Sequence, residues 1–253
     1  MSIAQKLQDI LDCKDAIKTS INNKGGSITA ATPLADYATA IDNLPSGSDE
    51  DLKKIIEGTA TTLTIPNGAT MIRNYAFYNL STLLNVEIPN TVTSIGTHAF
   101  QSTGLTTLDI PNSVITLGEQ FAAFCGELLS INFGNSVQTI GVQALYNDFK
   151  LTQLVFPDSL KEIKARATHG CSRVVYLEYG TGIETIANDA GAKNIGCIIV
   201  CKALTPPTLG TGFCPNNFAG KIYVPDASVN DYKTASNWSA WASFIYPLSE
   251  YTP

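Results

Sequence analysis

The chain has 253 residues, 44% of them hydrophobic, and carries 16 basic against 22 acidic residues for a formal charge of −6. This length and composition are enough for one large folded domain or two small ones with a buried core. Because no lysine or arginine cluster interrupts the acidic balance, the composition argues against a nucleic-acid partner. No apolar run approaches the ~20 residues that cross a bilayer, so we expect no membrane insertion.

Residues 1–44 are expected to form a short helical segment. Apolar side chains recur in it at gaps of four, three, seven and four residues, as in the heptad seam of an associating helix, at Ile3, Leu7, Ile10, Ile17 and Ile21. Gly25 and Gly26 end this helix, and Thr32 with Pro33 begins a second one. We therefore predict an anchoring and oligomerisation segment at 1–44, followed by a polar linker at 45–57.

From residue 58 to 225 the sequence repeats with a period of 21 to 23 residues. Each unit begins with an alternating apolar pair that indicates a strand. The pairs are Leu63/Ile65, Val86/Ile88, Leu108/Ile110, Ile131/Phe133, Leu154/Phe156, Leu177/Tyr179 and Ile198/Val200. Two more apolar columns follow each pair, at Ala69, Val92, Val114, Val137, Leu160 and Ile183, then at Ile72, Ile95, Leu117, Ile140, Ile163 and Ile186. A column before the pair comprises Leu83, Leu105, Leu128, Leu151, Val174 and Ile195.

This period is too short for a pair of helices in each unit and favours a solenoid with one short strand per coil. Stacking the coils buries the apolar columns and pairs each strand with the coils above and below. Prolines directly after four of the strand pairs end the strands and turn the chain, at Pro66, Pro89, Pro111 and Pro157.

The stretches "VEIPNTVTSIGTHAF" and "LDIPNSVITLG" carry a specific motif that resembles the BspA-like leucine-rich repeat family, and the likeness covers residues 61–243. The resemblance implies a mostly β leucine-rich-repeat solenoid, a right-handed coil with a parallel sheet on one face, preceded here by the short helical segment. It also implies surface attachment or protein binding rather than catalysis.

The later repeats depart from the motif. The Ala-Phe pair of Ala99/Phe100 becomes Ala167/Thr168 and then Ala190/Gly191, so the bulky filler is lost toward the carboxyl end. We expect those coils to pack less tightly or differently from the earlier ones.

Two cysteines, Cys125 and Cys171, occupy one register two coils apart, with Asp148 between them. Two strand spacings, ~10 Å, exceed the reach of a disulfide, which predicts free thiols.

The chain is expected to close with a carboxyl-terminal cap at 226–253. Its apolar side chains recur at near-helical spacing, at Tyr232, Ala235, Trp238, Trp241 and Ile245. We interpret the two tryptophans as a lid that packs on the last coil rather than as an aromatic ligand site, because an open solenoid end needs a cover.

The residues for catalysis or metal binding do not come together in the sequence. His98 and His169 lie far apart in variable positions, no C-x-x-C pair occurs, and no nucleophile-elbow, zinc-protease or phosphate-loop motif is present. We therefore predict no enzymatic activity, no cofactor and no metal.

The outward side chains of the strands are the candidate binding surface, because alternation places them opposite the core. We select Thr64, Glu87, Asp109, Asn132, Tyr176 and Glu178 as ligand-binding residues. This strip of hydroxyl, amide and acidic groups suits many weak polar contacts with a host surface glycan or protein. The alternative is an ordinary solvated sheet face.

The stretch "KGGSITAATPLADYATAI", Lys24 to Ile41, resembles amino-terminal segments of tail-fibre and head-fibre proteins of tailed bacteriophages. That likeness implies a virion component, made in the host cytoplasm, whose partners are virion structural proteins and other copies of itself. Charges within residues 1–18, where a signal peptide needs an apolar stretch, agree with this. The alternatives are a bacterial cell-surface or secreted adhesin lacking its export signal, and an amino-terminal segment that merely caps the first coil.

Overall fold

The computed structural model describes residues 61–65, 67–191 and 193–252. The predicted helical segment 1–44, the linker 45–57 and the seam formed by Ile3, Leu7, Ile10, Ile17 and Ile21 lie outside the described residues. No helix within the described ranges is both long and apolar enough to span a bilayer.

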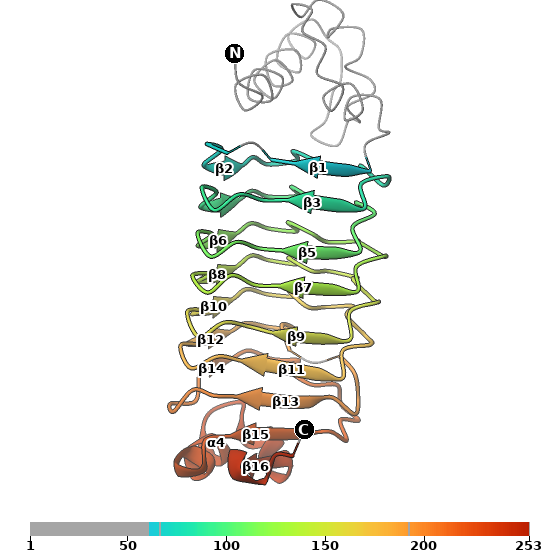
Figure 1. Cartoon of the computed structure of the whole chain (residues 1–253). Helices are drawn as coiled ribbons and strands as arrows, with labels where there is room; N and C mark the ends of the chain where they lie inside the picture. Colours follow the sequence, from blue (N-terminus) through green and yellow to red (C-terminus); the bar gives the residue numbers. More distant parts are fainter. Residues whose placement is uncertain (1–60, 66, 192, 253) are drawn as a thin grey trace, which may run out of the picture.

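The described chain winds into a stack of coils, and each coil except the last contributes a longer and a shorter strand (Figure 1). The longer strands are β1 (Thr62–Thr64), β3 (Asn85–Glu87), β5 (Thr107–Asp109), β7 (Ser130–Asn132), β9 (Gln153–Val155), β11 (Tyr176–Tyr179), β13 (Ile198–Cys201) and β15 (Lys221–Val224). The shorter ones are β2 (Met71–Ile72), β4 (Ser94–Ile95), β6 (Thr116–Leu117), β8 (Thr139–Ile140), β10 (Glu162–Ile163), β12 (Thr185–Ile186) and β14 (Thr208–Leu209). The predicted leucine-rich-repeat solenoid of parallel strands is confirmed.

Parallel pairing runs along two faces of the stack. The short strands form one sheet in the order β14-β12-β10-β8-β6-β4-β2. The longer strands form β1-β3, β5-β7 and β16-β15-β13-β11-β9, where β16 is Ile245–Pro247. The sequence predicts only the longer strands as a sheet, because a two-residue strand is too short for alternation to be recognised.

The predicted apolar columns lie in one continuous core. Leu83, Val92, Phe100 and Leu117 each expose 1% or less of their surface, and most other members are buried as well. The members that are only partly buried against this core are Ala69, Ile88 and Ile131. Alternation explains this burial, since β1, β3, β5 and β9 each turn their central residue inward and the flanking residues outward.

The seventh coil departs from the predicted register. Leu177 pairs with Ile199 and Tyr179 with Cys201, so the predicted pair Ile198/Val200 is wrong by one residue. Ile195 is 50% exposed, and Cys197 is buried at the start of this coil instead. The uninterrupted apolar run at residues 197–201 has no alternation to fix its register, and a one-residue shift exchanges its faces.

The later coils are packed differently rather than loosely. Phe77 and Phe100 stack 5.2 Å apart in the first coils, in the Ala-Phe position. Further along, the strand position becomes aromatic, and Phe133 to Phe156 and Phe156 to Tyr179 lie 5.1 and 5.5 Å apart. Thr168 and Ala190 nevertheless stay buried. Large side chains have therefore moved from one column to another while the core remains filled.

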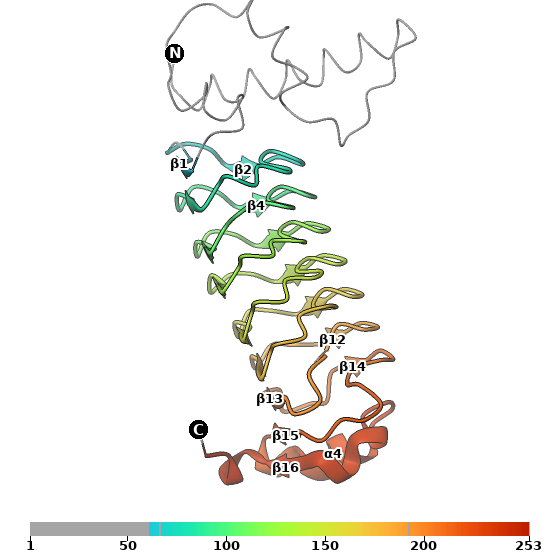
Figure 2. The same ribbon diagram turned by 90° about the vertical axis from the view of Figure 1, so that its right-hand side faces the viewer.

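The carboxyl-terminal residues cover the last coil (Figure 2). They form η2 (Asp226–Ser228), α4 (Val229–Thr234), η3 (Ser239–Phe244), β16 and η4 (Leu248–Glu250). Trp238 is fully buried and its indole N–H donates to the Pro207 carbonyl at 2.8 Å, while Trp241 packs against the core cluster. The prediction that both tryptophans pack on the last coil is confirmed, whereas the boundary at residue 226 stays a prediction.

Candidate interaction surfaces

The first four predicted ligand residues lie on one outward strand face. Thr64, Glu87, Asp109 and Asn132 belong to β1, β3, β5 and β7, and all four are exposed. The Thr64 hydroxyl donates to Glu87 Oε2 at 3.0 Å. The strip is shallow, hydrophilic and open to solvent, which suits contacts with an extended polar ligand.

The other two predicted residues, Tyr176 and Glu178, are half-buried in β11 and bind groups of this chain. The Tyr176 hydroxyl and the Lys202 ammonium each donate to the Glu178 carboxylate at 2.5 Å. Tyr251, from the carboxyl-terminal segment, stacks on Tyr176 with ring centroids 6.1 Å apart. Burial and the neighbouring Glu178 carboxylate raise the pKa of Tyr176. The open strip is therefore shorter than the predicted set of six residues.

The turns that follow the short strands form a second surface, the turn edge, which the sequence interpretation missed. Tyr75 stacks on His98 at 4.7 Å, and Tyr146 stacks on His169 at 5.3 Å with an interplanar angle of 11°. Each stack joins residues 23 apart, so aligning the variable positions of the repeat was a signal that could have found it.

The turn edge uses left-handed backbone at side-chain-bearing positions. One column of successive coils has φ between 48° and 60°, at Tyr75, His98, Gln120, Gln143, Arg166 and Asp189. In the following coil Gly212 takes the equivalent turn with φ of 69°. This conformation is uncommon for side-chain-bearing residues, and here hydrogen bonds between coils hold it, such as Gln120 N–H to the Val142 carbonyl at 2.9 Å.

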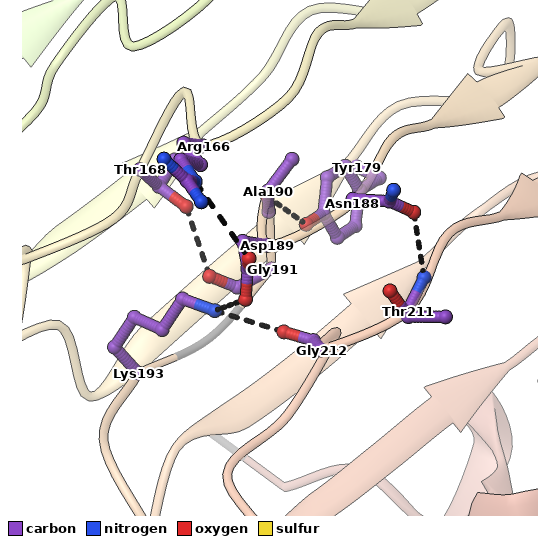
Figure 3. A network of polar contacts seen from close by, with 10 residues as sticks. All are labelled: Arg166, Thr168, Tyr179, Asn188, Asp189, Ala190, Gly191, Lys193, Thr211 and Gly212. Atoms are coloured by element: carbon purple, nitrogen blue, oxygen red, sulfur yellow. Dashed lines mark hydrogen bonds and ion pairs between the residues drawn. The ribbon is translucent and has the colours of Figure 1, made fainter.

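Toward the carboxyl end the turn edge becomes ionic (Figure 3). Asp189 lies 3.2 Å from the Lys193 ammonium and 3.9 Å from the Arg166 guanidinium. Lys193 also donates to the Gly212 carbonyl at 2.8 Å. Asp189 and Arg166 are partly exposed, so water screens these pairs and each contributes at most about 1 kcal/mol. The charges are satisfied within the network and tie three coils together.

A buried polar column crosses the core beside the turn edge. The backbone N–H of Cys125 donates to Asp148 Oδ1 at 2.7 Å, while Asp148 Oδ2 has no hydrogen-bond partner. The Thr103 hydroxyl contacts Cys125 Sγ at 3.3 Å. Burial raises the pKa of Asp148 well above its usual range. Burial therefore favours the neutral carboxylic acid over the carboxylate.

The thiols of this column are equally protected. Burial, with a smaller effect from Asp148, raises the pKa of Cys125 to about 12 and that of Cys171 well above its usual value. Both cysteines are free and buried. Because the thiolate is the reactive form, neither thiol is poised as a nucleophile.

The two histidines sit in separate turns of the turn edge, and His169 lies near the charged groups of Lys193, Asp189 and Arg166. Burial, with a contribution from Lys193, lowers the pKa of His169. His98 stacks on Tyr75 and shares a close contact between Nδ1 and the Gln101 amide oxygen. Within residues 61–65, 67–191 and 193–252, no group of three or more His, Cys, Asp or Glu could hold a metal ion.

The repeat geometry agrees with a family comparison. The model for the BspA type leucine rich repeat region matches residues 57–175 in six copies. Residues 57–175 are therefore similar to BspA-type leucine-rich repeats. The match includes all strands from β1 to β10, and the later coils continue the same winding beyond it. The comparison with curated proteins finds no match.

Solved structures of leucine-rich repeat proteins are also similar to parts of this chain. A protein from Bacteroides ovatus is 19% identical over 67% of this chain, with a TM-score of 0.44. One from Eubacterium ventriosum is 25% identical over 53%, with a TM-score of 0.49. The T. pallidum leucine rich repeat protein is 19% identical over 62% of this chain, with a TM-score of 0.46. The similar region makes up 79% of the T. pallidum chain. The chain spans 59% and 37% of the length of the first two.

Proposed function

We propose that this protein is a non-enzymatic binding protein whose BspA-type repeats attach it to a glycan or protein on a bacterial surface. The observation that carries the proposal is the exposed polar strip on β1, β3, β5 and β7, repeated coil after coil. Such a surface offers many weak, evenly spaced contacts, and several copies of the chain would gain affinity through effective concentration.

The absence of assembled catalytic chemistry in the described coils supports a binding role. The buried thiols of Cys125 and Cys171 are held in the protonated form. A binding role needs only a stable surface, which the continuous core under the strands provides.

The strip is tested by binding of the full chain to intact bacterial cells. Replacing Asp109 and Asn132 by alanine should weaken binding about tenfold, because two central polar contacts are lost. Glu184→Gln is the matched control, since this exposed residue lies outside the strip. Unchanged binding by the double variant, with the fold intact by circular dichroism, would remove the strip from the proposal.

A second candidate function is a phage virion component, which the phage-like stretch Lys24 to Ile41 favours. In this proposal residues 1–44 anchor an oligomer in the particle and the repeats point outward to the host. The test is whether the chain co-purifies with intact particles and whether deleting 1–44 abolishes this while the repeats stay folded. A shortened chain that remains on the particle would place the anchor elsewhere.

A further inference from the structure

Two phenylalanines on the turn edge are exposed, whereas the phenylalanines of the core columns are buried. Phe124 is 43% exposed and Phe149 is 47% exposed. Phe124 also has φ of 59°, a conformation that is uncommon for a bulky residue. Exposed aromatic surface of this kind contributes little to folding and commonly marks a contact surface.

Neighbouring coils hold these rings in place. The Phe124 N–H donates to the Tyr146 carbonyl at 2.8 Å, and the two rings lie 5.4 Å apart with an interplanar angle of 55°. Tyr146 in turn stacks on His169 of the next coil at 5.3 Å. Phe149 lies beside Gly126, where a Cβ would come within 3.3 Å of its ring. We call Phe124, Tyr146, Phe149 and His169 the aromatic edge; it spans three successive coils and is preorganised.

The surroundings of the aromatic edge are polar, with an ion pair beside the phenylalanines and the network of Arg166, Asp189 and Lys193 near His169. Lys150 and Glu127 neutralise each other at 2.6 Å. The Gln120 amide donates to the Gln143 amide oxygen at 2.8 Å on the same turns. His169 is uncharged at neutral pH because burial lowers its pKa. The two exposed phenylalanine rings are therefore flanked by a neutralised ion pair and by amide groups.

We propose that the aromatic edge binds a neutral glycan. Sugar rings carry apolar C–H faces that pack on aromatic side chains, and hydroxyls that pair with amide and imidazole groups. The inference rests on the proposed function in treating the repeats as a binding module. It assigns the glycan to the turns after β6, β8 and β10, rather than to the outward face of the longer strands.

The test measures binding of the full chain to neutral gluco-, manno-, galacto- and xylo-oligosaccharides, with sialylated and sulfated oligosaccharides as charged comparators. Binders found on an array are measured by calorimetry. The double substitution of Phe124 and Phe149 by alanine should weaken neutral-oligosaccharide binding at least tenfold. Phe149→Tyr, which keeps a ring, should retain binding within about threefold. Because both phenylalanines are exposed, the double variant should keep its circular dichroism spectrum and melting temperature.

The strand face supplies the control that separates this inference from the proposed function. Glu184→Gln, outside both surfaces, should leave neutral-oligosaccharide binding unchanged, whereas Asp109→Ala with Asn132→Ala tests the strand face. If that variant loses the sugar while the phenylalanine variant keeps it, the strand face is the glycan site and the aromatic edge is not. If the chain binds only charged oligosaccharides, or binds no oligosaccharide at all, the neutral-glycan inference is wrong. Attachment to cells through the strand face would still support the proposed function.

Discussion

The coils before β7 and those from β7 onward fill the same core in two ways. In the earlier coils the large side chains stand in the turn column, where Phe77 stacks on Phe100. In the later coils they stand in the strand column, where Phe133, Phe156 and Tyr179 form a ladder, and the turn column shrinks to Thr168 and Gly191. Buried side chains occur throughout both regions.

The repeat therefore specifies a volume per coil rather than a residue at each position. Protein interiors are close-packed, so a large side chain in one column is accommodated by small ones elsewhere. Gly191 illustrates the limit, because a Cβ there would lie 2.2 Å from the Phe213 carbonyl oxygen and 2.4 Å from Phe213 Cδ2. An aromatic residue on the next coil has taken the space that a side chain would need.

The largest expected effects come from emptying either aromatic column. Phe100→Ala and Phe156→Ala should each reduce the free energy of unfolding by about 3–5 kcal/mol, since both rings are buried and each deletion leaves a cavity. Urea denaturation followed by circular dichroism measures the loss. Similar losses would support two equivalent packing schemes, whereas a loss under about 1 kcal/mol at Phe156 would mean that the later coils are loosely packed.

A pH effect is expected from Asp148, in the column beside the turn edge. Its folded-state pKa is raised, so the unfolded chain loses this proton first as pH rises above ~4. Stability should therefore fall with rising pH, by about 1.4 kcal/mol per pH unit for one proton, until the folded-state pKa is reached. Asp148→Asn should remove this slope.

Denaturation midpoints of wild type and Asp148→Asn between pH 5 and 8 measure the effect. The two curves should diverge, with the variant gaining relative to wild type as pH rises. Parallel curves would show that Asp148 titrates alike in both states.

A smaller loss of stability is expected at Gly191, where the neighbouring coil leaves no room for a side chain. Gly191→Ala should destabilise the protein by about 1–3 kcal/mol, because backbone and ring atoms of Phe213 must move. Gly126→Ala is the matched control, since its Cβ would meet only the far end of the Phe149 ring, at 3.3 Å. Melting temperatures of the two variants compare the sites directly. Equal shifts would argue against tight packing at Gly191.

The smallest effect is expected on the open strand face. Glu87→Ala should change the free energy of unfolding by no more than about 0.5 kcal/mol, because the side chain and its hydrogen bond from Thr64 are exposed to solvent. Thr64→Ala is the companion variant and should behave alike. A loss above about 1 kcal/mol in either would give this face a structural role besides the proposed binding one.

Much of the core follows from the sequence because burial is repetitive. Val92 and Ile95 lie in columns whose other members are also apolar, and the structure buries both. Errors arise where periodicity fails. The repeat column predicts that Ile195 is buried. The spacing between this column and the strand β13 differs in the seventh coil, so Cys197 is buried there instead.

The candidate surfaces were predictable to different degrees. Alternation alone places Thr64 and Glu87 outward, since a strand reverses its side chains at every residue. It gives no sign that Tyr251 would stack on Tyr176, because that contact joins residues far apart in sequence. The aromatic edge was missed for a related reason, since its rings occupy positions that vary from coil to coil.

The sequence by itself determined the coil period, the inward columns and the outward strand face, because each depends on local alternation repeated along the chain. The tertiary structure decided which column holds the large side chains, how the seventh coil is registered and which surface rings come together. These features depend on volume and contact between neighbouring coils, and the spacing of residues within one coil carries no information about either.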